Sequence, residues 1–145
     1  LGSFGAYLAS SRKIIDYLVN TCRSFIYSTA LPPAVVASNL EAIALIKDEP
    51  LRRKKLLEQA QYFRQRLSDK GLRVLGDSQI VPIVIGDNLK TIALAQALQE
   101  KGFWVLPIRP PTVPKGQERI RFSLSYNHKQ EVLERLVSTI FELVA

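Results

Sequence analysis

Apolar residues in the first third of the chain recur at spacings that predict alternating extended and helical segments. Residues 5–9 predict a short buried strand, and residues 12–22 predict a helix that the two preceding serines can cap. The β-favouring residues 24–29 predict a further extended segment. A proline pair then fits the first turn of a helix ending near residue 47, because a proline loses no helical hydrogen bond there.

Downstream of residue 47 the same patterns predict helices and short strands joined by short loops. A charged break that contains a proline, residues 47–50, separates the two regions. The expected elements are a helix over about 51–70 ended by Gly71, strands at 72–75 and 80–85, a helix from Asp87 or Asn88 to Lys101 ended by Gly102, strands at 103–106 and 119–125, and a helix capped by Asn127 with Gln130 as its partner. We therefore predict an α/β chain with two domains, 1–47 and 48–145. The second is expected to be an α+β domain with a small mixed or antiparallel sheet and helices on one face.

Two arginines stand out as candidate binding residues. The segment 119–125 alternates between polar and apolar side chains, and Arg121 lies in its middle, on the face opposite the apolar row. Arg109 lies in the proline-rich loop 107–114, which would hold a side chain at low entropic cost. A guanidinium group binds a carboxylate in a two-point fork. The alternative for each arginine is a surface salt bridge.

Composition adds little to this picture. Of 145 residues, 47% are hydrophobic and 23% charged, which is typical of a globular protein. Apolar runs are too short to span a bilayer, so we expect no membrane partner. The single cysteine allows no internal disulfide, and we expect a cytoplasmic protein. Because the chain contains no methionine, we also expect it to be part of a longer protein.

The formal charge of +7 raises the question of nucleic acid. Basic residues are spread along the chain, however, and the one run, residues 52–55, has no aromatic residues among it to stack on bases. We therefore favour a solvated basic surface and expect no nucleic-acid partner. A non-catalytic basic module that binds RNA or an acidic partner is the alternative.

Common catalytic patterns are absent from the sequence. One histidine, His128, cannot form a histidine metal cluster, and we expect no metal site. His128 follows a possible helix cap and is expected to be a surface or capping residue rather than a base. Cys22, beside Arg23, is expected to be a small packed thiol rather than a nucleophile.

Several segments, in order along the chain, carry a resemblance to a known family. The segments are Gly2–Tyr7, Ser24–Pro33, Ile80–Asp87, Ile108–Pro114, and Glu118–Ser125 followed by His128. Together they resemble the α-oxoamine synthases, acyltransferases of the aspartate-aminotransferase fold type that depend on pyridoxal phosphate. The Arg-Pro-Pro-Thr-Val-Pro run and the single glycine before Ala6 most resemble the members that make 8-amino-7-oxononanoate in biotin biosynthesis.

The resemblance implies a reaction. An amino acid, L-alanine for the biotin enzymes, condenses with pimeloyl-CoA or pimeloyl carrier protein and loses its carboxylate, with pyridoxal phosphate stabilising the carbanion. An enzyme of the same family that uses glycine or serine is the alternative.

The resemblance also implies roles for individual residues. Arg121 corresponds to the arginine that holds the amino-acid carboxylate, and Arg109 to a second active-site arginine directed towards the acyl substrate. Ser28 and Thr29 match hydroxyls that reach the cofactor phosphate from the neighbouring subunit of a homodimer. The family's cofactor-binding lysine would lie upstream of Leu1, so residues 1–47 would be the tail of the large domain. We accordingly expect no catalytic residue within the chain, no cofactor bound by the chain alone, and no activity from it alone.

Overall fold

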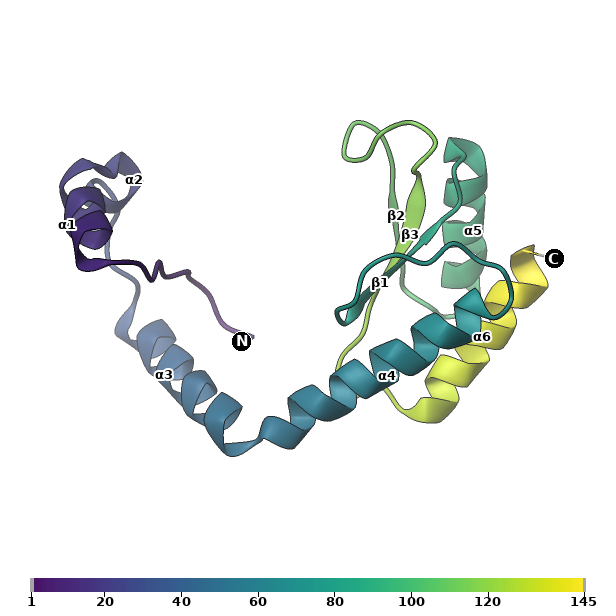
Figure 1. The fold of residues 1–145 in the computed structure, drawn as a ribbon, viewed down its shortest axis with the longest axis horizontal. Coiled ribbons are helices and arrows are strands. Elements are labelled where there is room, and N and C mark those ends of the chain that lie inside the picture. The colour runs from purple at the N-terminus through teal and green to yellow at the C-terminus, as the bar shows by residue number, and fades with distance from the viewer. Residues whose placement is uncertain (1, 145) are drawn as a thin grey trace. The chain divides into compact units, whose positions relative to one another are not determined.

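The computed structural model describes residues 2–144 and divides the chain into two compact units. The units are Leu1–Pro50 and Leu51–Ala145 (Figure 1). Among the described residues, all the buried side chains lie in the second unit. The two units are therefore very different in packing, and each is described by itself.

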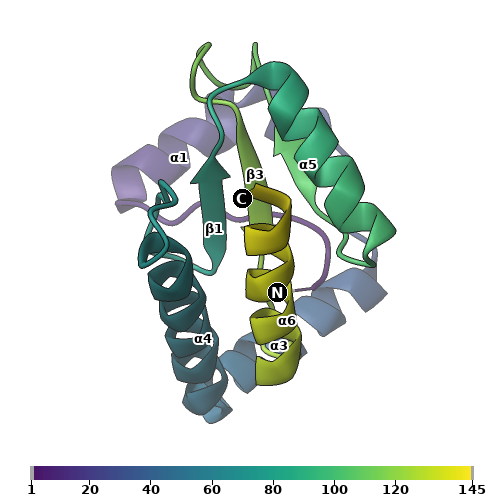
Figure 2. The ribbon, with the colours of Figure 1, turned by 90° about the vertical axis from the view of Figure 1, so that its right-hand side faces the viewer.

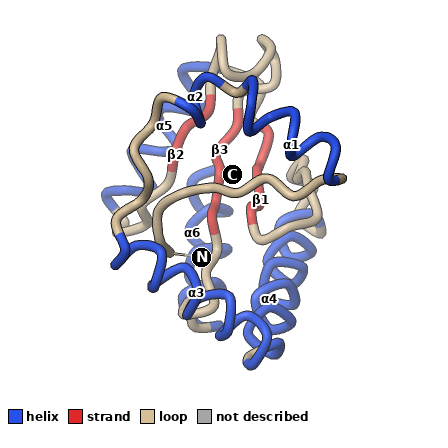
Figure 3. Tube along the Cα trace, turned by 90° about the vertical axis from the view of Figure 1, so that its left-hand side faces the viewer, coloured by secondary structure: helices blue, strands red, loops and turns tan. Residues whose placement is uncertain are grey.

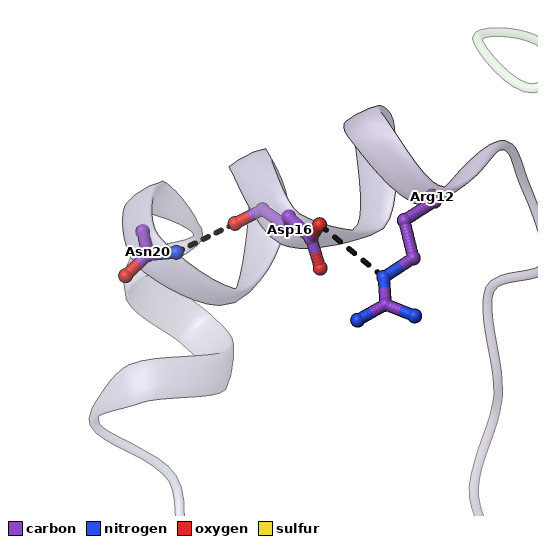
Figure 4. Close-up of polar contacts among 3 residues, drawn as sticks. All are labelled: Arg12, Asp16 and Asn20. Carbon is purple, nitrogen blue, oxygen red and sulfur yellow. Dashed lines mark hydrogen bonds and ion pairs between the residues drawn. The ribbon is translucent and has the colours of Figure 1, made fainter.

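The first unit contains three helices without a shared core. They are α1 (Arg12–Thr21), α2 (Arg23–Ile26) and α3 (Pro33–Asp48). Helix α1 is reinforced by local contacts along its surface: Arg12 Nε lies 3.5 Å from Asp16 Oδ2, and Asn20 Nδ2 donates to the Asp16 carbonyl at 2.7 Å (Figure 4). The helices predicted from the sequence over 12–22 and from the proline pair onward are confirmed, and Pro33 is the first residue of α3.

Two predictions for this unit are wrong. Residues 5–9 form no strand, since among residues 2–144 no strand pairs with them and a strand needs a neighbour to satisfy its backbone groups. Residues 24–26, predicted to be extended, belong to the helical turn α2. The Ser28 hydroxyl donates to the Ser24 carbonyl and closes that turn, so local hydrogen bonding outweighs the β propensity of this run.

The second unit is an open antiparallel sheet covered on one face by three helices. Its elements are α4 (Pro50–Ser68), β1 (Ile80–Val84), α5 (Asn88–Glu100), β2 (Leu106–Ile108), β3 (Arg119–Ser123) and α6 (Gln130–Val144). The strand order is β1-β3-β2, with both pairings antiparallel. Helices α4, α6 and α5 lie side by side over the same face of the sheet (Figure 2), and the strands lie in front of them in the opposite view (Figure 3). The predicted fold class is confirmed.

The core lies between the sheet and these helices. Phe63 of α4 and Phe122 of β3 meet edge to face, with ring centroids 5.4 Å apart. Ile120 on β3 and Ile140 on α6 are fully buried around them. The alternation predicted for 119–125 is therefore confirmed, and β3 presents its polar row to the other face of the sheet.

Two helix boundaries in this unit follow the predicted caps. Asp87 accepts a hydrogen bond from the Lys90 amide at 2.8 Å and caps α5. Gly71 has φ +81°, in the left-handed region, where α4 ends. The Leu72 amide returns to the Leu67 carbonyl at 3.3 Å, which satisfies one of the last carbonyls of the helix.

The two short predicted strands differ from what is found. Residues 72–75 make one bridge, Val74 to Ile83, because Pro82 in β1 has no N–H with which to continue the ladder. The strand predicted at 103–106 is displaced to β2, which shares Leu106 with it. The backbone of 103–105 is bonded to the end of α5 instead: the Phe103 amide donates to Leu98 and the Val105 carbonyl accepts from Gln99.

The predicted cap of the last helix is also wrong. Helix α6 begins at Gln130, and Asn127 lies in a turn before it. The Ser125 amide donates to Nδ1 of His128 at 3.2 Å, and the His128 amide donates back to the Ser125 carbonyl at 3.1 Å. These bonds close the turn at 125–128, and α6 begins after it. His128 therefore caps a turn rather than a helix.

Candidate functional site

The face of the sheet away from the helices is apolar around two arginines. Residues directly opposite each other in a sheet share a face, so the register places Arg121 between Pro82 and Leu106. The same register places Arg119 between Val84 and Ile108. Leu106 is 42% exposed, so this face is open. Two guanidinium groups therefore stand on a surface that is otherwise apolar at these positions.

Arg121 is the less satisfied of the two. Its side chain is half-buried, and none of residues 2–144 accepts a hydrogen bond from its Nε, which is buried. A covered N–H without an acceptor is costly, and a guanidinium pairs well with a carboxylate. The surface salt bridge considered for Arg121 is not formed within the described residues, because its cross-strand neighbours are apolar.

Arg119 is held by a residue that the sequence did not single out. Its Nε donates to the Gln117 carbonyl at 2.9 Å, and its Nη2 donates to Gln117 Oε1 at 3.0 Å. Gln117 lies in the loop before β3, where no hydrophobic period or motif marks it. The arrangement leaves Arg121 as the arginine of this face without an acceptor among residues 2–144.

Arg109 lies just past β2, in the loop that extends beyond the ends of β2 and β3 (Figure 1). Its side chain is exposed, while its carbonyl accepts from the amides of Thr112 and Val113 at 3.0 and 3.4 Å and tightens the loop. Because Ile108 pairs with Arg119, Arg109 is three positions from Arg121 along the strands, or roughly 10 Å. Arg109 therefore lies in the loop beyond the end of the sheet at which Arg119 stands, whereas Arg121 lies in the middle of β3.

Ser28 and Thr29 lie in the first unit, in the turn after α2, and both are exposed. The Ser28 hydroxyl uses its proton on the Ser24 carbonyl. A phosphate oxygen accepts hydrogen bonds, so Thr29 suits one directly, whereas Ser28 would first have to release its bond. These residues are thus chemically compatible with a phosphate group, Thr29 more readily.

Cys22 lines an apolar cavity of about 620 Å³ with residues that include Leu8, Leu18 and Phe25. Its thiol lies 3.3 Å from the Ser24 hydroxyl. That hydrogen bond, helped by the Phe25 backbone, lowers the pKa of Cys22 below its usual value. Tyr7 also lines the cavity, and Cys22 is partly exposed, so the thiol is only partly packed.

Comparison with known proteins identifies the family. The aminotransferase class I and II family model matches residues 1–140. The chain belongs to the aminotransferase class I and II family. The resemblance to α-oxoamine synthases is confirmed by the relatives below.

Three relatives illustrate the similarity. A putative 8-amino-7-oxononanoate synthase of Geobacillus kaustophilus is 43% identical over 141 residues, which is 97% of this chain and 36% of the relative. A serine palmitoyltransferase of Sphingomonas wittichii matches with a TM-score of 0.89 at 28% identity, over 98% of this chain and 36% of that one. An 8-amino-7-oxononanoate synthase of Francisella tularensis matches with a TM-score of 0.80 at 26% identity, over 93% and 40%. The chain thus spans about a third of the length of the curated relatives it matches.

Within the described residues, no helix combines the length and apolar character required to cross a bilayer.

Proposed function

We propose that this chain is part of an α-oxoamine synthase that condenses an amino acid with an acyl thioester, with loss of carbon dioxide. The observation that carries this is Arg121, a half-buried guanidinium on an open apolar face with an unsatisfied N–H. Its proposed role is to bind the amino-acid carboxylate in a fork. The 43% identity to a putative 8-amino-7-oxononanoate synthase favours L-alanine, a pimeloyl thioester and a place in biotin biosynthesis.

Pyridoxal phosphate, when bound, would supply an electron sink for the carbanion that attacks the thioester. This chain's proposed contribution is to hold and orient the reactants. Thr29 would donate to the cofactor phosphate, with Ser28 beside it, from the neighbouring subunit of a homodimer. Arg109 would face the acyl substrate.

The lysine that carries the cofactor is proposed to lie outside this chain, upstream of Leu1. In that arrangement residues 1–47 belong to the large cofactor-binding domain and residues 48–145 form the small domain. The isolated 145-residue chain would then be inactive and would not hold the cofactor, whereas the full-length enzyme would act in the cytoplasm. An absorbance band of bound cofactor from the isolated chain would contradict this.

Replacing Arg121 with alanine in the full-length protein tests the proposal. Hydrogen bonds to charged groups contribute about 1.5–3 kcal/mol, so KM for L-alanine should rise roughly 10- to 100-fold. Arg119→Ala is the matched control, since it removes the same kind of side chain from the same face of β3. Thermal unfolding of both variants separates binding from folding, and unchanged alanine kinetics in Arg121→Ala would remove Arg121 from the site.

A second candidate uses a different amino acid. The TM-score of 0.89 to a serine palmitoyltransferase favours serine as an alternative substrate, within the same carboxylate-binding arrangement. Steady-state kinetics with L-alanine, L-serine and glycine, each with pimeloyl-CoA and palmitoyl-CoA, distinguish these candidates by kcat/KM. A preference for serine with palmitoyl-CoA would replace the alanine assignment and leave the role of Arg121 intact.

A further inference from the structure

Two arginines at this spacing could bind two carboxylates. Arg119 and Arg121 are two positions apart on the same face of β3, so their Cα atoms are separated by about 7 Å. Long, flexible side chains on such a pair can converge on a ligand with two anionic groups. In the structure, however, the Arg119 side chain donates hydrogen bonds within the chain, whereas Nε of Arg121 has no acceptor among residues 2–144.

Gln117 holds Arg119 through both of its acceptors. The bond from Nε to the backbone carbonyl is 2.9 Å and the bond from Nη2 to the side-chain Oε1 is 3.0 Å. Both acceptors belong to a residue that precedes Arg119 by two positions, whereas Arg121 follows it by two. The guanidinium of Arg119 is thereby drawn along the strand away from Arg121.

The neighbouring strands offer Arg119 no competing acid. Its cross-strand partners are Val84 and Ile108, both apolar, and those of Arg121 are Pro82 and Leu106. Within residues 2–144, Gln117 is the residue that accepts hydrogen bonds from the Arg119 side chain. The difference between the two arginines therefore depends on Gln117.

We infer that Gln117 is a specificity-determining residue: by occupying the Nε and Nη2 side of Arg119 it leaves Arg121 as the arginine of this face with a free Nε, so the site accepts an amino acid with a single carboxylate and discriminates against L-aspartate. This rests on the proposed function, in which Arg121 binds the amino-acid carboxylate. A second carboxylate could pair with Arg119 through its Nε and Nη2 side only after displacing the Gln117 side chain from Nη2. Gln117 contributes no chemistry of its own and acts only through Arg119.

The kinetic test uses the full-length holoenzyme and the ratio of kcat/KM for L-aspartate to that for L-alanine. Gln117→Ala removes the Oε1 acceptor and should raise this ratio about fivefold, the change expected from one partly exposed charged contact. The double variant Gln117→Ala/Arg119→Ala should return the ratio to the wild-type value, because the gain requires a released Arg119. Gln130→Ala, which removes an exposed glutamine on α6, should leave the ratio unchanged.

A binding test does not depend on the loaded enzyme. In the 145-residue chain labelled with ¹⁵N, the Nε–Hε signals of the arginines can be followed while acetate or succinate is added. In the wild type both anions should shift the Arg121 signal and leave the Arg119 signal in place. In Gln117→Ala, succinate should shift both signals and acetate mainly that of Arg121.

Two outcomes would overturn the inference: an unchanged aspartate-to-alanine ratio in Gln117→Ala, or a gain that survives in the double variant. A wild-type Arg119 signal that moves with succinate as far as that of the variant would also overturn it. Failure of the proposed function would look different. In that case the Arg121 signal would respond to neither anion, and Arg121→Ala would leave alanine kinetics unchanged.

Discussion

At the scale of single residues, function depends on which polar groups the fold leaves unsatisfied. Arg119 and Arg121 have the same chemistry, lie on one face of one strand and differ by two positions. Gln117 accepts from Nε and Nη2 of the first, while Nε of the second has no acceptor within residues 2–144. Availability for a ligand is therefore set by neighbours rather than by residue type.

The Cys22 thiol gives a residue-scale prediction with a definite sign. The Ser24 hydroxyl, 3.3 Å away, stabilises the thiolate and lowers the pKa of Cys22. Ser24→Ala should raise that pKa, so the thiolate fraction at neutral pH falls and alkylation by iodoacetamide becomes slower. The pH at which the alkylation rate is half-maximal should move upward.

Ser28→Ala is the control for this measurement, because the Ser28 hydroxyl bonds to the Ser24 carbonyl and not to the thiol. An alkylation profile that stays at the same pH in Ser24→Ala would show that the hydroxyl does not set the pKa of Cys22.

At the scale of secondary-structure elements, some of the caps expected from the sequence form and others do not: Ser11 makes no side-chain hydrogen bond to α1, and Asn127 lies outside α6. Asp87 and Gly71 occupy the cap positions that their residue types favour. The 72–75 and 103–106 segments, in contrast, have strand-like composition but lose ladder hydrogen bonds to a proline or to a helix end. A strand depends on a partner with free backbone groups, and a cap does not.

Removing the α5 cap should have a measurable cost. Asp87→Ala leaves the Lys90 amide without its acceptor at 2.8 Å, and loss of such a cap typically costs about 1 kcal/mol. Urea denaturation followed by circular dichroism should show a lower midpoint with an unchanged slope. Asp77→Ala is the control, since Asp77 is an exposed loop aspartate. Equal midpoints for the two variants would mean that the cap contributes nothing.

At the scale of the whole molecule, the two units differ in how they bury apolar surface. The second unit has a core that includes Phe63, Leu98, Ile120 and Ile140, all fully buried. Helices α1, α2 and α3 of the first unit contain no buried residue. Stability in a folded chain follows burial, so the units should open with different free energies.

Amide hydrogen exchange of the 145-residue chain tests this difference. Amides of α1 and α3 should exchange more than about tenfold faster than those of β3 and α6, because their helices lack packed cover. Exchange resolved by residue, by NMR, gives the comparison directly. Equal protection from exchange in α3 and α6 would contradict this prediction and would indicate that the helices of the first unit are packed against other groups in solution.

The site could be predicted from the sequence only in part. Alternation along 119–125 placed Arg121 on the face opposite the core, because side-chain direction in a strand follows from parity alone. Arg109 was predicted on a different ground, the rigidity of its proline-rich loop, and its role stays a prediction. Gln117 was missed, because a hydrogen bond between neighbouring loop and strand residues leaves no periodic trace in the sequence.

The sequence by itself determined the family, the fold class, the longer helices and the faces of β3, since these follow from motifs, periodicity and local capping. Only the tertiary structure decided which segments found strand partners and which arginine was already occupied. Residues 5–9 and 24–29 show the reason. Their composition favours a strand, but a strand forms only if a neighbouring backbone pairs with its N–H and C=O groups. Local rules fix what a residue can do, whereas the surrounding fold fixes which of its groups remain free to do it.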